Sequence, residues 1–213
     1  VLPRIEALAD RFERISYGRL DYAGETYEQY ALSSRDWDPA LPSALITGGV
    51  HGYETSGVMG ALAFLEDHAT AYAGRINLLV VPCVSPWGYE RINRWNYDAV
   101  DPNRNFRVDG PSREATNLMT LTKSRDFVLH IDLHETTDSD ESEFRPALAA
   151  RDGKPFEPGL VPDGFYLVAD AADPRLEFQA EVIAAVAAVT HIAPPDEAGQ
   201  IIGCPVVSPG VIT

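Results

Sequence analysis

A histidine and a glutamate three residues apart, His51 and Glu54, follow a run that ends in Gly48-Gly49. At that spacing, in a turn that enters a helix, both side chains can face one point. Imidazole and carboxylate are both ligands of catalytic zinc, which takes three protein ligands and leaves one position open for water. The pair therefore predicts two ligands of a zinc site and requires a third from elsewhere in the chain.

The third ligand is predicted to be His134, one of five histidines in the chain. It follows the apolar run 127–133, and ligands of open α/β sheets bind beyond the carboxyl ends of strands. His130 lies four residues earlier, a separation of about 13 Å along an extended strand. The two histidines could not both ligate one ion without a break in the strand, so His130 is interpreted as a hydrogen-bonded core histidine.

The elements that must position these residues alternate between strands and helices. Strands are predicted at 17–33 (as a hairpin), 44–47, 76–81, 127–133 and 165–169, and helices at 3–14, 56–67, 112–124 and 176–189. Ser112 is the candidate cap of its helix, and residues 134–162 are predicted to form a loop. Because the strands are apolar throughout, the sequence predicts a single α/β domain over residues 1–213, with a mixed, mostly parallel central sheet and helices on both faces.

Composition and charge limit the classes of partner. Apolar residues make up 45% of the chain, enough for a sizeable core, yet no run approaches the roughly 18 apolar residues of a membrane helix. A net charge of −15 disfavours nucleic acid, whose phosphates need a basic face. The amphipathic N-terminus differs from a signal peptide, which favours a cytoplasmic protein. The oligomeric state is left open.

Three blocks of the sequence resemble the zinc carboxypeptidase A superfamily, which includes the succinylglutamate desuccinylase and aspartoacylase branch. They are GGVHGYE at 48–54, DPNRNF at 101–106 and DLHETT at 132–137, in the right order along the chain. The resemblance implies a zinc carboxypeptidase-like fold with one zinc ion held by His51, Glu54 and His134. It agrees with the ligands predicted from the residues themselves.

The resemblance also implies roles for the middle block. Asn103 and Arg104 would bind a carboxylate of the substrate, to which the planar fork of arginine is matched. Asp101 would hold His51 by its outer nitrogen. An arginine that stabilises the oxyanion is expected nearby, with Arg94 as the first candidate and Arg91 as the second.

The resemblance to the family is incomplete at the general base. Hydrolysis needs a carboxylate that carries a proton from water to the leaving amine, and the resemblance implies a glutamate on a late strand. One expectation is that the sequence ends at Thr213, before that strand and a following helix. The other is that Glu135 serves as the base, although neighbours on an extended backbone point in opposite directions.

These features predict a zinc-dependent metallocarboxypeptidase-like hydrolase, a protease that cleaves the amide bond next to a free carboxylate. Its substrate would be a peptide that loses its C-terminal amino acid. The alternative is a deacylase of N-acyl amino acids, which the DLHETT block favours, whereas the DPNRNF block favours a peptidase. A second alternative is a non-catalytic module that binds metal or carboxylate.

Overall fold

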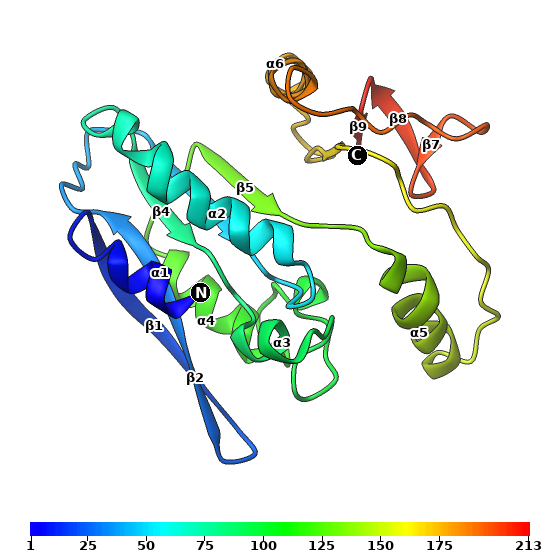
Figure 1. The fold of residues 1–213 in the computed structure, drawn as a ribbon, viewed down its shortest axis with the longest axis horizontal. Coiled ribbons are helices and arrows are strands. Elements are labelled where there is room, and N and C mark those ends of the chain that lie inside the picture. The colour runs from blue at the N-terminus through cyan, green and yellow to red at the C-terminus, as the bar shows by residue number, and fades with distance from the viewer. The chain divides into compact units, whose positions relative to one another are not determined.

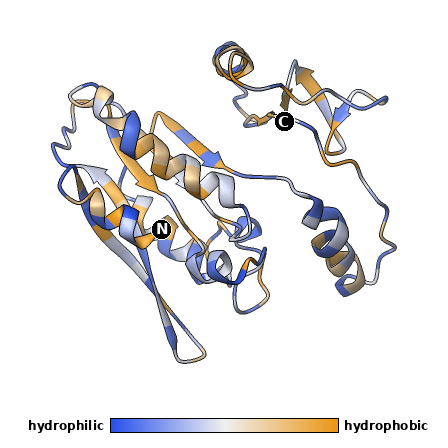
Figure 2. Cartoon of the chain, in the orientation of Figure 1, coloured by the Kyte–Doolittle hydropathy of each residue, from blue (hydrophilic) through white to orange (hydrophobic).

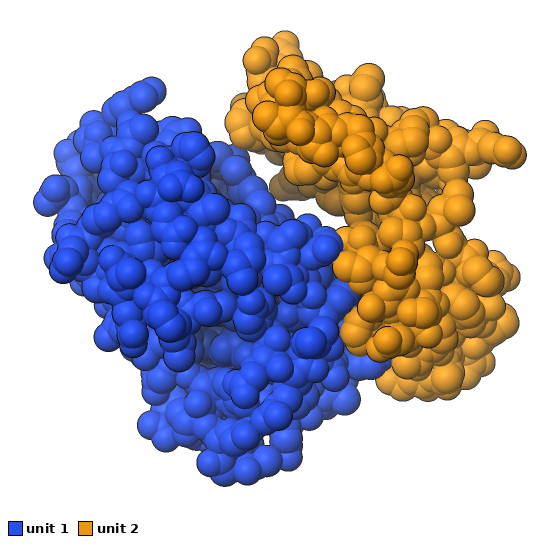
Figure 3. Space-filling model, in the orientation of Figure 1, with its two compact units in different colours: residues 1–135 blue, residues 136–213 orange.

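The computed structural model describes all 213 residues, which form two compact units, residues 1–135 and 136–213 (Figure 3). Both units combine helices with strands, and the strands pair in parallel and antiparallel fashion (Figure 1). The mixed α/β class predicted from the sequence is therefore confirmed. That the whole chain acts as a single domain stays a prediction.

The first unit is built on a five-stranded sheet in the order β1-β2-β4-β3-β5. Its strands are β1 (Phe12–Tyr22), β2 (Glu25–Ser34), β3 (Ser43–Gly48), β4 (Asn77–Val81) and β5 (Leu129–Leu133). The β1–β2 and β2–β4 pairs are antiparallel, whereas β3 is parallel to β4 and to β5. The sheet is thus mixed, as predicted. Its parallel part consists of β4, β3 and β5, and its other strand pairs are antiparallel.

One helix precedes these strands and others connect them, at positions that agree with the sequence in part. They are α1 (Leu2–Ala7), α2 (Thr55–Asp67), α3 (Pro86–Arg91) and α4 (Arg113–Thr122), with short 3₁₀ turns η1 (Ala69–Tyr72) and η2 (Pro102–Arg104). The Ser112 side chain caps α4 by accepting a hydrogen bond from the Ala115 amide, as predicted. The predicted helix over 3–14 ends at Ala7, because from Phe12 onward the backbone pairs with β2.

Two of the three buried clusters of this unit share the central strands, and the third lies in the β1–β2 hairpin. Adjacent residues of β3 point to opposite faces of the sheet, so Ile46 packs in one cluster and Leu45 in the other. The first cluster includes Leu62 and Leu65 of α2, and the second includes Leu118 of α4. The central strands are accordingly hydrophobic, whereas the far end of the β1–β2 hairpin is hydrophilic (Figure 2).

The second unit contains a four-stranded sheet in the order β6-β9-β8-β7. Its elements are a π-helical turn η3 (Asp140–Phe144), α5 (Arg145–Arg151), β6 (Leu167–Val168), α6 (Leu176–Ala187), β7 (Gln200–Ile201), β8 (Cys204–Ser208) and β9 (Val211–Ile212). The predicted loop over 134–162 is wrong from Asp140 to Arg151. The charge and proline content of this segment favoured a loop, but Pro146 lies in the first turn of α5, where its missing N–H is tolerated.

None of the helices in either unit combines the length and the apolar character that crossing a membrane requires.

Candidate metal centre

Two parallel strands end at the same edge of the sheet and bring the predicted ligands together. Gly48 at the end of β3 is the register partner of Leu133 at the end of β5. His51 lies in the loop after β3, Glu54 occupies the N-cap position of α2, and His134 follows β5 directly. The site therefore forms where parallel strands end, as the alternation of strands and helices predicted.

A glycine in the first turn of α2 permits this close approach. A Cβ atom on Gly57 would lie 2.4 Å from the carbonyl oxygen of Leu133. Any larger side chain would therefore push the start of α2, and Glu54 with it, away from the end of β5. The glycine-rich sequence before and within α2 is thus a packing requirement of the site.

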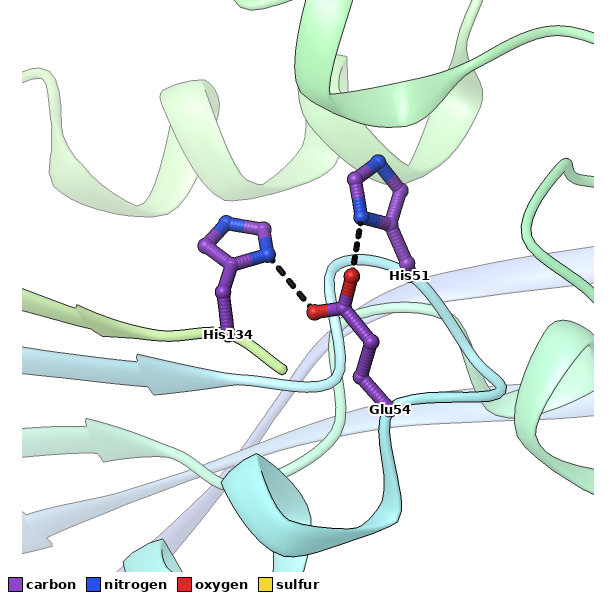
Figure 4. A group of neighbouring side chains, drawn as sticks. All are labelled: His51, Glu54 and His134. Carbon is purple, nitrogen blue, oxygen red and sulfur yellow. Dashed lines mark hydrogen bonds and ion pairs between the residues drawn. The ribbon is translucent and has the colours of Figure 1, made fainter. Parts of the chain in front are cut away.

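The carboxylate of Glu54 lies between the two histidines (Figure 4). Its Oε1 atom is 2.7 Å from Nδ1 of His51, and its Oε2 atom is 2.7 Å from Nδ1 of His134. One potential ligand atom from each of the three residues lies within 4.8 Å of the others. The structure thus brings together the three residues predicted as metal ligands.

A carboxylate holds the outer nitrogen of each histidine. Nε2 of His51 is 2.9 Å from Oδ1 of Asp101, as the resemblance implied, and Nε2 of His134 is 2.7 Å from Oδ2 of Asp132. Such contacts fix the orientation of a ligating imidazole and leave its other nitrogen free to bind metal. This role of Asp132 is not among those predicted from the sequence, although its position two residues before His134 was the available signal.

Burial and charge fit this cluster to a cation. The His51 and Glu54 side chains are 2% exposed, and that of His134 is 32% exposed. Burial opposes ionisation of Glu54, but hydrogen bonds from His134 and His51 outweigh it and lower its pKa to about 2. Burial likewise opposes the charged form of His134, but the contacts with Asp132 and Glu54 raise its pKa to about 10. A bound cation would therefore replace a proton held between anionic groups.

The donor set also fits zinc. Two imidazoles and one carboxylate form one of the ligand sets found in catalytic zinc sites. Three carboxylates, those of Glu54, Asp101 and Asp132, surround the two histidines. Burial opposes ionisation of Asp132, but its contacts with His134 outweigh this and lower its pKa. The excess of negative charge is what a divalent cation would balance.

Of the two arginines considered for oxyanion stabilisation, Arg94 lies beside the cluster. Its Nε atom is 3.6 Å from Oδ2 of Asp101, and its Nη1 atom donates to the hydroxyl of Tyr53 at 3.1 Å. Arg91 instead forms an exposed ion pair with Glu25 of the β1–β2 hairpin, with a shortest N–O distance of 2.6 Å. The geometry favours Arg94 over Arg91.

The block that contains Asn103 and Arg104 forms η2 next to Asp101. The Asn103 backbone amide donates to Oδ1 of Asp101 at 2.9 Å. Burial opposes ionisation of Asp101, but the hydrogen bond with His51 outweighs it and lowers its pKa, helped by the charges of Arg94 and Arg104. The side chain of Arg104 is exposed and forms no ion pair. Its guanidinium is therefore available to a ligand near the cluster.

Glu135, the alternative candidate for the base, is engaged elsewhere. Its Oε2 atom accepts hydrogen bonds from the amide and the hydroxyl of Ser56, at 3.0 and 2.9 Å. Its backbone amide donates to Oε2 of Glu54 at 3.1 Å. The carboxylate thus satisfies free donors in the first turn of α2 and ties the end of β5 to that helix.

A buried hydrogen-bond network, which the sequence did not predict, supports the segment leading to Asp101. Glu114, which is 1% exposed, accepts hydrogen bonds from the Tyr22 hydroxyl at 2.7 Å and from the Asn96 side chain at 2.9 Å. The side-chain oxygen of Asn96 accepts in turn from the amide of Val100 at 2.9 Å. The partners are distant in sequence, so no local pattern reveals them.

A family model described as "Protein of unknown function (DUF2817)" matches residues 36–150, more than half of the chain. The chain belongs to this family. The segment that matches DUF2817 contains the three predicted ligands, the two outer carboxylates, the arginines and Glu135. A search of curated proteins found no match.

Solved structures place this DUF2817 protein in a wider fold group. A "putative metallopeptidase" from Shewanella denitrificans is 24% identical, with a TM-score of 0.71 over 99% of this chain and 70% of that one. Another, from Shewanella amazonensis, is 25% identical, with a TM-score of 0.70 over 99% and 71%. A metallo-carboxypeptidase from Burkholderia cenocepacia is 18% identical, with a TM-score of 0.52 over 63% and 39%. The chain shares its fold with these proteins, which agrees with the resemblance of its sequence blocks to the zinc carboxypeptidase A superfamily.

Proposed function

We propose that this chain is a zinc-dependent, metallocarboxypeptidase-like hydrolase that cleaves an amide bond next to a free carboxylate. One zinc ion would be held by His51, Glu54 and His134. The observation that carries the proposal is the convergence of Nδ1 of both histidines on the buried carboxylate of Glu54, while carboxylates hold both outer nitrogens. The metallopeptidase and metallo-carboxypeptidase names of the structural neighbours support it.

A zinc ion at this point would supply a Lewis acid for the scissile carbonyl and lower the pKa of a water molecule toward 7. The protein's own contribution is to orient the metal ligands and to exclude bulk water from them. His51 and Glu54 are almost fully buried, whereas the His134 side chain is a third exposed. The substrate would therefore approach from the side of His134.

Two arginines would bind the substrate at different points. Arg104 carries an exposed guanidinium without an ion pair, and a substrate carboxylate matches its planar fork. Asn103, the preceding residue, would add a neutral hydrogen bond. Arg94 lies closer to the cluster, next to Asp101, and would stabilise negative charge that develops on the carbonyl oxygen.

Proton transfer from water to the leaving amine requires a further carboxylate. Glu54, Asp101 and Asp132 are engaged with the histidines, and Glu135 is engaged with Ser56. The proton carrier would therefore be a carboxylate outside the cluster, or Glu135 after its side chain leaves Ser56.

The test is hydrolysis by the zinc-loaded chain of three substrates: an N-blocked dipeptide with a free C-terminal carboxylate, the same dipeptide as a C-terminal amide, and an N-acyl amino acid. We expect turnover of the free acid and none of the amide. Arg104→Ala should raise KM for the free acid by about 10- to 100-fold, since hydrogen bonds to charged groups contribute about 1.5–3 kcal/mol. Arg107→Ala, an exposed arginine three residues further on, is the matched control.

The outcome also separates the candidate functions. Turnover of the N-acyl amino acid but not of the dipeptide would replace the peptidase by the deacylase, for which Arg104 would have the same role. Zinc binding without turnover of either substrate would contradict a hydrolase and leave a module that binds metal or carboxylate. An unchanged KM in Arg104→Ala would remove that residue from the substrate site.

A further inference from the structure

The pairing of β3 with β5 places a buried hydroxyl beside the candidate ligands. Thr47 on β3 is the register partner of Asp132 on β5, so the two side chains are neighbours on one face of the sheet. Thr47 is 1% exposed. His130 precedes Asp132 by two residues, which puts it on the same face of β5.

These three residues form a chain of hydrogen bonds that leads to His134. The Thr47 hydroxyl donates to Oδ1 of Asp132 at 2.6 Å, and Oδ2 of Asp132 faces Nε2 of His134 at 2.7 Å. A hydroxyl has one proton to donate, and here the Thr47 hydroxyl donates it in the hydrogen bond to Asp132. The 2.9 Å contact between Thr47 and Nε2 of His130 therefore has the histidine as donor.

His130 thus has a definite task in this chain. By donating to the oxygen of Thr47, it leaves the threonine proton only one direction, toward Asp132. His130 is hydrogen-bonded, as the sequence suggested, but it is exposed on the edge strand, so its interpretation as a core residue is wrong.

We propose that Thr47 is a positioning residue of the metal centre, which holds the carboxylate of Asp132 in the orientation that fixes the ring of His134. The inference rests on the proposed function, because it takes His134 to be a metal ligand. The terminal torsion of an aspartate has broad preferences, so a carboxylate held at only one oxygen leaves its histidine more orientations. Outer partners of metal ligands contribute to affinity in this way.

Metal affinity of the full chain, measured by competition with a chromogenic zinc chelator, tests the proposal. Thr47→Val keeps the shape but removes the hydroxyl, and we expect it to weaken zinc binding by about tenfold, the lower end for an outer partner. Thr47→Ser restores the hydroxyl and should bind within about twofold of the unmodified chain by the same argument. Ser43→Ala, a buried hydroxyl at the other end of β3, is the matched control.

A second readout separates positioning from a general loss of stability. The visible absorption spectrum of the cobalt-substituted protein reports the geometry around the metal, so it should change in Thr47→Val and return in Thr47→Ser. Because His130 is exposed, His130→Ala should fold normally and weaken zinc binding by about threefold, less than an outer partner itself.

The proposal is overturned if Thr47→Val keeps the zinc affinity and the cobalt spectrum of the unmodified chain. It is also overturned if Thr47→Ser is as weak as Thr47→Val, since the hydroxyl would then be irrelevant. Absence of hydrolysis from a zinc-binding chain contradicts the proposed function but leaves this comparison of affinities intact. A chain that binds no zinc contradicts both proposals.

Discussion

The two histidines of the candidate metal centre are supported in different ways. His51 shares a short loop with Glu54, is almost fully buried, and is held by an aspartate that lies near a cationic arginine, Arg94. His134 follows an edge strand, has a side chain that is 32% exposed, and is held by Asp132. Burial thus restrains the first histidine, whereas hydrogen bonds carry most of the restraint on the second.

This difference indicates how the site divides its tasks. The loop of His51 and Glu54 is fixed by packing between β3 and α2, before any metal is bound. His134 is the more exposed ligand, on the side from which a substrate would approach under the proposed function. The orientation of its ring relies on the hydrogen bonds from Thr47 to Asp132 and from Asp132 to His134. A change in these hydrogen bonds should therefore affect the metal more than an equal change on the buried side.

Replacing the outer aspartates one at a time gives the largest expected contrast. Asp132→Asn should weaken zinc binding by about 100-fold and Asp101→Asn by about tenfold, the two ends of the range for outer partners of metal ligands. The smaller effect is expected at Asp101 because burial and the neighbouring loop still restrain His51. Asp98→Asn, an exposed residue close in sequence to Asp101, is the control.

Zinc affinity by chelator competition measures this contrast. Equal losses, or a larger loss in Asp101→Asn, would contradict the view that hydrogen bonds restrain His134 more than His51.

Replacing Glu135 is expected to have a smaller effect, on the stability of the contact between the end of β5 and the start of α2. The Glu135 carboxylate binds the amide and hydroxyl of Ser56 at the start of α2. Because loss of a helix N-cap costs about 1 kcal/mol, Glu135→Ala should lower the free energy of unfolding of the metal-free chain by about that amount. Glu90→Ala, an exposed glutamate of α3, is the control, and urea unfolding is the measurement.

The activity of the same variant distinguishes two roles for Glu135. If it only ties α2 to β5, kcat should fall by less than about tenfold, whereas loss of a general base costs about 10²–10⁴-fold. A large loss of kcat with unchanged stability would assign proton transfer to Glu135 after all.

The convergence of His51, Glu54 and His134 could be predicted because the apolar strands and intervening helices locate the strand ends. Parallel strands share an edge, so residues that follow them meet there. The outer contact of Asp101 followed from the family resemblance. The sequence could not reveal the roles of Thr47 or Glu114, because their partners depend on strand register and on segments far away in sequence.

The predictions failed where tertiary pairing competes with a local pattern. Helical spacing relates Ile5, Leu8 and Phe12, and all three pack in the same core cluster. Phe12 nevertheless belongs to β1, which pairs with β2. In the second unit, charge and Pro146 concealed the helical stretch from Asp140 to Arg151. The helix α5 has no buried residue, so it leaves a weak hydrophobic signal in the sequence, whereas the more apolar α6 lies within the helix predicted over 176–189.

X-ray absorption at the zinc edge of the loaded chain tests the central claim most directly. The account predicts two imidazole nitrogens and carboxylate oxygen at about 2.0–2.2 Å, and loss of one imidazole in His51→Ala. Cys83 is a concrete alternative ligand. Its sulfur lies 3.6 Å from the position that a Cβ atom on Gly49 would occupy, and Gly49 is close in sequence to His51. Sulfur at about 2.3 Å, or an unchanged spectrum in His51→Ala, would contradict the assignment of the metal centre.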